Sequence, residues 1–282
     1  VGKEIFKILK NKANKSTYDV FGTYYTNQIE GLEQLDITNL SAVEKVLEKI
    51  NPSVLIHTAA ITYPLRCEEN RELAWKINVE GTKNLAQCCM KKNCKMVFIS
   101  SDGVFNGKNG PFDETHKTNP LNYYGETKVE SEKIVSEIND YLIIRTAWVN
   151  DVGPNSRSFV MQVINSLQNG NVFNAPIDQF GHPTYSTNLA EIIIELIKNN
   201  YNGIFHVTGS TYIDRFHFAK KIAKAFDLNP EMIHETTTDL NQSHTRPMKV
   251  QMKLDKLKSS ISTKILSLDE QLDSMRNNYH IV

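Results

Sequence analysis

Two side chains that can move a proton stand four positions apart near the middle of the chain. Tyr124 and Lys128 lie in the run 119–128, which reads Asn-Pro-Leu-Asn-Tyr-Tyr-Gly-Glu-Thr-Lys. On a helix this spacing places both side chains on one face. An ammonium group beside a phenol favours the phenolate, so we expect the tyrosine pKa to fall below its ordinary value of about 10. The pair is therefore predicted to give or take a proton near neutral pH, although Tyr-x-x-x-Lys alone is a common pattern.

A serine that can bind a substrate oxygen comes shortly before this pair. Residues 98–107 read Phe-Ile-Ser-Ser-Asp-Gly-Val-Phe-Asn-Gly and end a strongly apolar run. Because ligands of α/β sheets bind at the carboxyl ends of parallel strands, Ser101 is expected to donate a hydrogen bond to a carbonyl oxygen. A turn built from Ser-Ser-Asp-Gly is the purely structural alternative. Small residues end another apolar run at 56–62 and would let a flat or phosphorylated ligand approach closely.

The elements that position these residues alternate between short apolar runs and longer helical patterns. The runs at 54–60, 95–100 and 141–147 are almost continuously apolar, as expected of strands buried on both faces. This alternation predicts an α/β fold with a doubly wound parallel sheet. Strands are expected at 19–25, 53–58, 95–100, 141–146 and 203–207. Helices are expected at 2–11, 41–50, 70–92, 122–138, 158–168, 187–198, 215–226 and 268–275, the second opening with a Ser41–Glu44 capping box.

The first residues are unusual for such a sheet. A doubly wound fold normally opens with a strand and a glycine-rich turn, whereas this chain enters a helix at Gly2. We expect the first strand and most of that turn to precede residue 1; the alternative is a sheet that begins at Asp19. Residues 1–148 with 187–207 are predicted to form a dinucleotide-binding domain. Residues 149–186 with 208–282 are predicted to form a smaller α/β substrate-binding lobe.

Composition excludes several classes of partner. Lys+Arg and Asp+Glu both number 32 in 282 residues, so no charge excess favours nucleic acid or an anionic membrane. No run resembles a membrane span or a signal peptide, and a cytoplasmic location is expected. The cysteines are too few for a disulfide scaffold and match no common zinc spacing, so we expect buried free thiols and no metal site. They are Cys67, Cys88, Cys89 and Cys94.

Four motifs in a fixed order give the chain a specific family resemblance. It resembles an extended short-chain dehydrogenase/reductase with a Rossmann-like sheet, and within that superfamily the dTDP-4-dehydrorhamnose reductase family. The family pattern runs roughly Ser-Thr-Asp-Tyr-Val-Phe-x-Gly, Asn-x-Tyr-Gly-x-(Ser/Thr)-Lys, Arg-Thr-x-Trp and Asp-Gln-x-Gly-x-Pro-Thr. The matching runs here are Ser-Ser-Asp-Gly-Val-Phe-Asn-Gly at 100–107, Asn-Tyr-Tyr-Gly-Glu-Thr-Lys at 122–128, Arg-Thr-Ala-Trp at 145–148 and Asp-Gln-Phe-Gly-His-Pro-Thr at 178–184. Arg246-Pro247 and the run 254–257 fit as well.

The resemblance implies a role for each matching residue. Tyr124 would be the catalytic acid, Lys128 would lower its pKa and hold the nicotinamide ribose, and Ser101 would polarise the ketone. The implied cofactor-binding residues are Gly2, Asp36, Ile37, Thr58, Ala59, Ala60, Asn78, Tyr124 and Lys128. Among these, Gly2 matches the last glycine of a Gly-x-x-Gly-x-x-Gly turn, and Asn78 matches a structural and proton-relay asparagine. The implied substrate-binding residues are Thr62, Asp102, Trp148, Gln179, Pro183 and Thr184.

The same resemblance implies reduction of a nucleotide-linked 4-keto sugar, in the first instance dTDP-4-dehydro-L-rhamnose to dTDP-L-rhamnose, a step in polysaccharide biosynthesis. Residues 24–27 carry no carboxylate of the kind that binds the ribose hydroxyls of NAD(H), which favours NADP(H). No arginine stands there either, so use of NAD(H) is left open. Gly103 replaces a tyrosine of the family that would face the sugar, which leaves the sugar itself open.

Two other functions stay in view, since a shared fold does not fix a function. A sugar-nucleotide epimerase or dehydratase is one, although dehydratases of this superfamily typically carry Asp-Glu where this chain has Asp102-Gly103. The other is a non-catalytic NADP-binding subunit that resembles the regulatory β subunit of methionine adenosyltransferase, which shares an Ile-Ser-Ser-Asp run. A homodimer is also left open.

Overall fold

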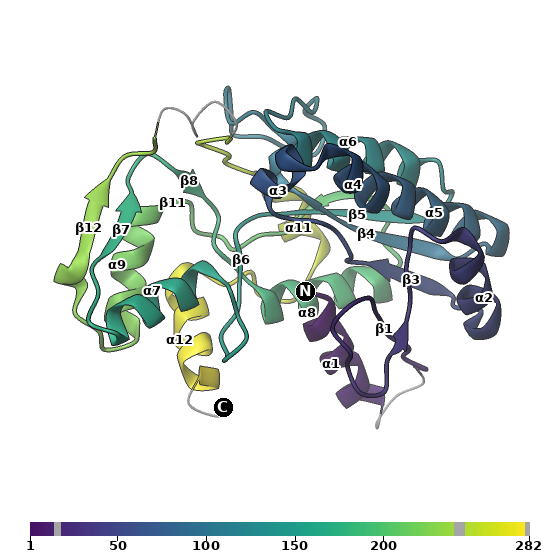
Figure 1. Cartoon of the computed structure of the whole chain (residues 1–282), viewed down its shortest axis with the longest axis horizontal. Helices are drawn as coiled ribbons and strands as arrows, with labels where there is room; N and C mark the ends of the chain where they lie inside the picture. The colour runs from purple at the N-terminus through teal and green to yellow at the C-terminus, as the bar shows by residue number, and fades with distance from the viewer. Residues whose placement is uncertain (14–17, 240–245, 280–282) are drawn as a thin grey trace.

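A four-stranded parallel sheet lies at the centre of the computed structural model, which describes residues 1–13, 18–239 and 246–279 (Figure 1). Its strand order is β10-β5-β4-β3. The strands are β3 (Val54–His57), β4 (Lys95–Ser101), β5 (Tyr141–Thr146) and β10 (Gly203–His206). In the register, Phe98 lies opposite Ile143 and Ser101 opposite Thr146. The predicted α/β fold with a parallel sheet is confirmed.

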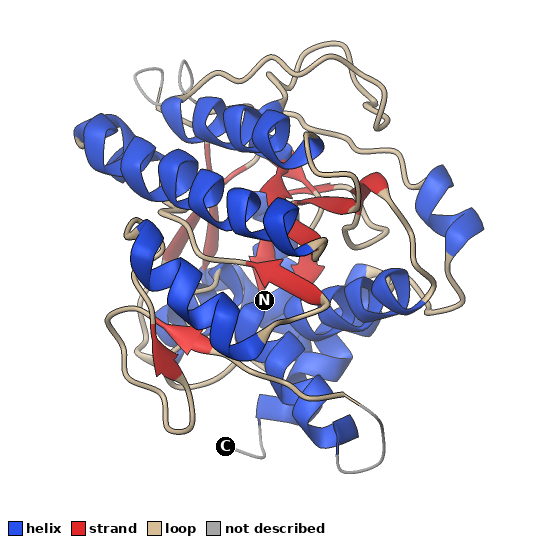
Figure 2. Cartoon of the chain, turned by 90° about the vertical axis from the view of Figure 1, so that its right-hand side faces the viewer, coloured by secondary structure: helices blue, strands red, loops and turns tan. Residues whose placement is uncertain are grey.

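Helices cover both faces of this sheet, as the turned view also shows (Figure 2). On one face, Met96, Phe98 and Ile143 pack beneath three helices: α2 (Leu40–Ile50), α5 (Gly81–Lys92) and α6 (Tyr123–Ser136). On the other face, Val97 and Leu142 pack against α1 (Gly2–Ala13) and α8 (Ser186–Lys198). Successive residues of a strand point to opposite faces, so a strand buried on both must be apolar throughout.

Several predicted elements differ in detail from the structure. The run 19–25 contains only the short strand β1 (Thr23–Tyr24), which pairs with β2 (Glu33–Gln34) in a separate sheet. The predicted capping box is wrong: α2 begins at Leu40, and the side chain of Asn39 accepts the backbone N–H of Ala42 at 3.1 Å. Asn39, two residues before Ser41, caps the helix instead, because its amide oxygen accepts an otherwise unpaired N–H of the first turn.

The predicted helix at 70–92 is interrupted by a π-helical turn. It consists of α4 (Arg71–Trp75), the π turn (Lys76–Glu80) and α5. A short helix that the pattern did not predict, α3 (Pro64–Glu69), precedes them with proline at its first position. π turns are rare and often accompany functional sites, and this one contains Asn78.

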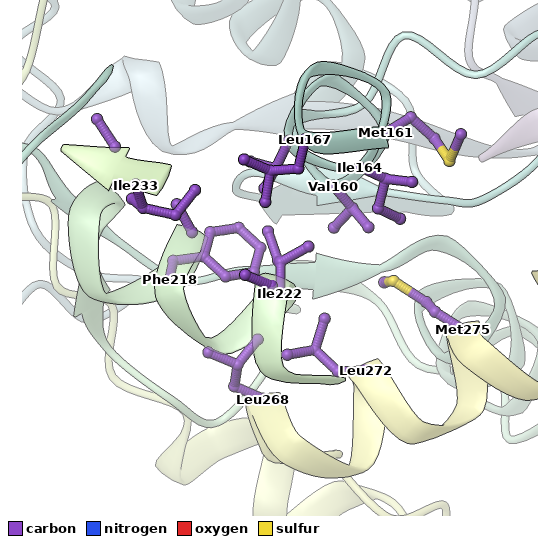
Figure 3. Packing of buried hydrophobic residues seen from close by; sticks show 14 of the residues in the cluster. Val160, Met161, Ile164, Leu167, Phe218, Ile222, Ile233, Leu268, Leu272 and Met275 are labelled. Carbon is purple, nitrogen blue, oxygen red and sulfur yellow. The ribbon is translucent and has the colours of Figure 1, made fainter. Parts of the chain in front are cut away.

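The C-terminal part of the chain has a hydrophobic core of its own. The elements around it are α7 (Phe159–Gln168), β7 (Phe173–Pro176), α9 (Arg215–Ala225), β12 (Ile233–Thr236) and α12 (Leu268–Tyr279). Figure 3 shows Phe218 and Ile222 of α9 facing Leu272 and Met275 of α12. The division into two domains stays a prediction.

Short strand pairs and one further helix complete the described chain. They are β6 (Val149–Asn150) with β9 (Thr184–Tyr185), β8 (Phe180–Gly181) with β11 (Ile213–Asp214), and α11 (Asp255–Ser260) against β10. Within the described residues, no helix is both long and apolar enough to cross a membrane. All four cysteines are buried free thiols, as predicted.

Candidate active site

Ser101 ends the central strand β4 and begins a tight turn. Its hydroxyl donates to Oδ1 of Asp102 at 3.0 Å and accepts the backbone N–H of Gly103 at 3.0 Å. Residues 102–104 form a single 3₁₀ turn, which stops the strand and turns the chain away from the sheet. Ser101 therefore lies at the carboxyl end of a parallel strand, where the sequence placed it.

The other two candidate catalytic residues lie on helix α6. Asn122 caps this helix, with its side chain accepting the backbone N–H of Gly125 at 2.8 Å. Tyr124 lies in the first turn and Lys128 one turn later. Gly125 is required by packing: an added Cβ would lie 2.3 Å from the carbonyl oxygen of Gly103. This close approach brings the Tyr124 side chain near Ser101: a Cβ built on Gly103 would touch both the Ser101 hydroxyl and the Tyr124 ring, and Ser101 lowers the pKa of the phenol.

The electrostatics of the pair differ from the prediction. Burial raises the pKa of Tyr124, and the hydrogen bond with Ser101 opposes this rise only in part. Burial also lowers the pKa of Lys128 to about 8. The ammonium donates to the carbonyl oxygen of Ile99 at 2.7 Å and lies 4.3 Å from the centre of the Phe98 ring. The expected lowering of the tyrosine pKa by Lys128 is therefore not seen: burial raises the Tyr124 pKa, and Asp102 and Cys67 raise it further.

Asn78 joins three elements around the pair. Its side-chain oxygen accepts the N–H of Ile61 at 2.8 Å, and its amide nitrogen donates to the Ile61 carbonyl at 3.0 Å. The same nitrogen donates to Oγ1 of Thr127 at 3.0 Å, and Thr127 donates to the carbonyl of Tyr124 at 2.7 Å. The π turn, the loop after β3 and helix α6 are therefore held together by one buried amide.

The residues predicted to bind a cofactor gather partly at the end of β3. Gly2, at the start of α1, lies so close to Thr58 that an added Cβ would be 2.6 Å from its Oγ1. Thr58 and Ala59 are exposed and Ala60 is half-buried. Asp36 accepts the N–H and hydroxyl of Thr38, whereas the side chain of Ile37 lies against Gly81 and the sheet core.

The residues predicted to bind the sugar nucleotide come from both parts of the chain. Thr62 is exposed on the loop after β3. Burial raises the pKa of Asp102 to about 6. Gln179 donates to Oγ1 of Thr238 at 2.9 Å. Pro183 and Thr184 are buried and make structural bonds: the Pro183 carbonyl accepts from Gln271, and Oγ1 of Thr184 donates to the His182 carbonyl and accepts the N–H of Gly209.

Trp148 is held in an unusual position. Its backbone φ is +38°, in the left-handed region that bulky residues rarely adopt. The indole lies against Gly181, where an added Cβ would be 2.4 Å from a ring carbon. The guanidinium of Arg215 also lies against the indole, 3.7 Å from the ring centre.

Arg215 was not predicted from the sequence. Arg215 is the first residue of α9, whose N-cap is Asp214. Its positive charge lowers the pKa of Asp102, although burial raises that pKa more. The only sign of Arg215 in the sequence is that it is a single arginine in the aromatic-rich segment 212–218. Its contact with Trp148 arises only in the folded chain. Arg246 fits the family pattern, but the sequence assigned it no role. In the structure its Nη1 donates to Oε1 of Gln179 at 2.9 Å.

The fold and the arrangement of motifs define the class of this protein as an extended short-chain dehydrogenase/reductase. The chain belongs to the family described as the RmlD substrate binding domain, whose model matches residues 1–281.

Named relatives span most of the chain. It is 27% identical to a dTDP-4-dehydrorhamnose reductase of Aggregatibacter actinomycetemcomitans, over 98% of this chain and 95% of the relative. It is 28% identical to the methionine adenosyltransferase 2 subunit beta of Xenopus tropicalis, over 91% of this chain and 78% of that one. A crystal structure of dTDP-4-dehydrorhamnose reductase from Bacillus anthracis in complex with NADP is 32% identical. It has a TM-score of 0.79 and covers 86% of this chain and 87% of its own.

Proposed function

We propose that the protein reduces a nucleotide-linked 4-keto sugar with NADPH, in the first instance dTDP-4-dehydro-L-rhamnose to dTDP-L-rhamnose. The observation that carries the proposal is the approach of Tyr124, in the first turn of α6, to Ser101 at the end of β4, with Lys128 one turn further along α6. Two hydroxyl groups that face one point can bind the two lone pairs of a single carbonyl oxygen. The named reductases among the relatives support this choice.

The residues at the end of β3 suit a dinucleotide. Thr58 and Ala59 are exposed there beside the start of α1, and helix N-termini favour phosphate groups. Residues 24–27 offer no carboxylate to repel a 2′-phosphate, so NADPH is the proposed cofactor. Gly2, Thr58, Ala59, Ala60 and Lys128 would hold it, with Asp36 and Ile37 toward the adenine. When bound, NADPH supplies the hydride that reduces the ketone.

Side chains of the protein would then stabilise and neutralise the negative charge that develops on the carbonyl oxygen. Tyr124 donates its proton to that oxygen while Ser101 keeps a hydrogen bond to it. The raised pKa of Tyr124 keeps the phenol protonated before the reaction. The Lys128 ammonium on the same helix face stabilises the phenolate that forms. Asn78 acts as a positioning residue, because its amide fixes the loop after β3 and, through Thr127, the backbone of Tyr124.

The first test is Tyr124→Phe, which removes the proton donor and keeps the ring. NADPH oxidation on addition of dTDP-4-dehydro-L-rhamnose should fall by at least about 100-fold, the usual size of an acid–base contribution. Tyr123→Phe, on the same helix turn, is the matched control and should retain activity. Near-normal turnover in a folded Tyr124→Phe protein would overturn the role of Tyr124.

The identity of the sugar depends on the space at Gly103. An added Cβ would lie 3.4 Å from Oγ of Ser101 and 3.6 Å from Cδ1 of Tyr124, which is ordinary contact. A side chain there would therefore begin beside the Ser101 hydroxyl and the Tyr124 ring, and we infer that glycine leaves that volume to the substrate. If the rhamnose precursor is not reduced, other nucleotide-linked 4-keto sugars should be tried next.

A regulatory role is the second candidate, because the methionine adenosyltransferase 2 subunit beta matches most of the chain. Such a subunit would bind NADP without reducing a sugar. Failure to oxidise NADPH across a panel of keto sugars, together with co-purification of a methionine adenosyltransferase, would favour it over the reductase.

A further inference from the structure

The first turn of α6 receives a carboxylate from another helix. Glu68, in the short helix α3, accepts the backbone N–H of Tyr123 with its Oε1 at 2.7 Å. The first N–H groups of a helix have no partner within it and carry a partial positive charge, so a carboxylate stabilises them well. Asn122 accepts another N–H of this turn, that of Gly125. Two hydrogen bonds, one local and one from α3, therefore fix the backbone on either side of Tyr124.

Arg71 orients this carboxylate. Its Nη2 and Nε both donate to Oε2 of Glu68, at 2.8 and 3.3 Å, which leaves Oε1 for the helix. Its guanidinium also lies 4.7 Å from the centre of the Tyr123 ring. Burial raises the pKa of Glu68, but the Tyr123 N–H and Arg71 together hold that pKa below its ordinary value, so the carboxylate is charged at neutral pH. An exposed ion pair alone contributes little. What distinguishes Glu68 is that its other oxygen binds a second helix.

A second anchor holds α3 on its buried side. Cys67 is fully buried, and its thiol donates to the carbonyl oxygen of Ile61 at 3.5 Å. The side-chain amide of Asn78 donates to the same oxygen at 3.0 Å. The outer side of α3 packs against α6 (Figure 1). The helix is therefore held between the loop after β3 and α6, and contacts on both sides set the position of Glu68.

We propose that Glu68 is a positioning residue that fixes the first turn of α6, and through it the Tyr124 phenol, beside Ser101. This inference rests on the proposed function and adds to it a residue that contacts only the backbone of the turn that carries Tyr124. The effect of such a residue can be large, because a displacement of about 1 Å at a reacting group can cost about 100-fold in rate. Loosening of the first turn should cost less than that, since the Asn122 cap remains.

Kinetics give the first test. Glu68→Ala removes the carboxylate and should lower kcat for keto-sugar reduction about 10-fold, while the KM values for NADPH and for the sugar change by less than about twofold. Glu68→Gln keeps an oxygen that can accept the Tyr123 N–H, so it should regain most of the rate. Glu69→Ala removes a carboxylate from the next, exposed position of the same helix and is the matched control. It should turn over like the wild type.

A spectroscopic readout separates this role from the reductase activity. The tyrosines are replaced with fluorotyrosine, and the fluorine NMR signal of Tyr124 is identified as the one that is missing in Tyr124→Phe. Glu68→Ala should shift or broaden this signal, because the surroundings of the ring change when the first turn loosens. Glu68→Gln and Glu69→Ala should leave it at the wild-type position.

The proposal fails if a folded Glu68→Ala protein matches the wild type in its Tyr124 signal, or if Glu69→Ala shows the same changes as Glu68→Ala. If Glu68→Ala does not fold, Arg71→Met, at an exposed position, removes the partner that orients the carboxylate and should shift the same signal. An unchanged signal in that variant would equally overturn the proposal. A wild type that reduces no keto sugar, with the signal still shifted in Glu68→Ala, would support the positioning of Tyr124 and reject only the reductase.

Discussion

At the residue scale, burial changes the candidate site more than any single charge does. It raises the pKa values of Tyr124 and Asp102 and lowers that of Lys128 to about 8. All three shifts favour the neutral form, as expected where water is scarce. A lysine with a pKa of about 8 is charged below that pH and loses its charge as the pH rises through it.

The lowered pKa of Lys128 predicts how the turnover rate depends on pH on the alkaline side. The reductase rate should fall above about pH 8, because the ammonium that stabilises the phenolate is lost there. Lys128→Arg keeps its charge at high pH and should lose this fall, at a lower absolute rate. A pH profile of turnover for both proteins checks this. The same fall in Lys128→Arg would assign the limb to another group.

At the scale of elements, α6 brings Tyr124 to the site because its first turn packs directly on the backbone of the turn after β4. Gly125 permits this contact, with Gly103 as the backbone it touches. A second helical glycine, Gly81 of α5, is crowded by side-chain atoms of Ile37, with Cδ1 and Cγ1 both 2.7 Å from an added Cβ. Both are glycines near the start of a helix, but an added Cβ meets a backbone carbonyl at Gly125 and a side chain at Gly81.

Gly125→Ala should therefore cost about 1–3 kcal/mol in the free energy of unfolding, as overpacking usually does, and should lower turnover by moving Tyr124. Gly81→Ala should cost less, because the atoms in its way belong to a side chain rather than to the backbone, and alanine favours a helix. Denaturant unfolding and NADPH oxidation measure both effects. Equal losses in the two variants would show that backbone contact at Gly125 is not what matters.

The sequence predicted the strands of the central sheet because they are apolar throughout, and it predicted Ser101 at the carboxyl end of one of them. That Ser101 and Tyr124 act together was implied by the family resemblance. It missed α3 and the two-residue strand pairs, since such short segments carry no periodicity. It also missed the effect of burial on Tyr124, and it missed Arg215, whose meaning depends on Trp148 from a distant part of the chain.

At the scale of the whole molecule, two separate hydrophobic cores support the two sides of the site. The clusters beside the sheet support Ser101 and α6. The C-terminal cluster supports α9, which carries Arg215, through contacts with α12 (Figure 3). Damage to one core should therefore affect one ligand more than the other.

Leu272→Ala in α12 and Leu196→Ala in α8 test this separation, since both leucines are almost fully buried. Each should cost about 2–5 kcal/mol in the free energy of unfolding. Only Leu272→Ala should raise the KM for the keto sugar by more than the KM for NADPH. Steady-state kinetics below the unfolding transition measure the difference. Equal changes in both KM values for the two variants would contradict two independent supports.

The π turn at Lys76–Glu80 makes the length of the chain at this point as important as its composition. A π turn holds one residue more than the α-helix around it would need. Loss of one residue would restore a regular helix and rotate everything before the deletion by about 100° relative to α5. Asn78 would then face away from Ile61 and Thr127, while the helix itself would survive. Relatives that differ by a single-residue gap here would thus be expected to keep the fold and to have changed their chemistry.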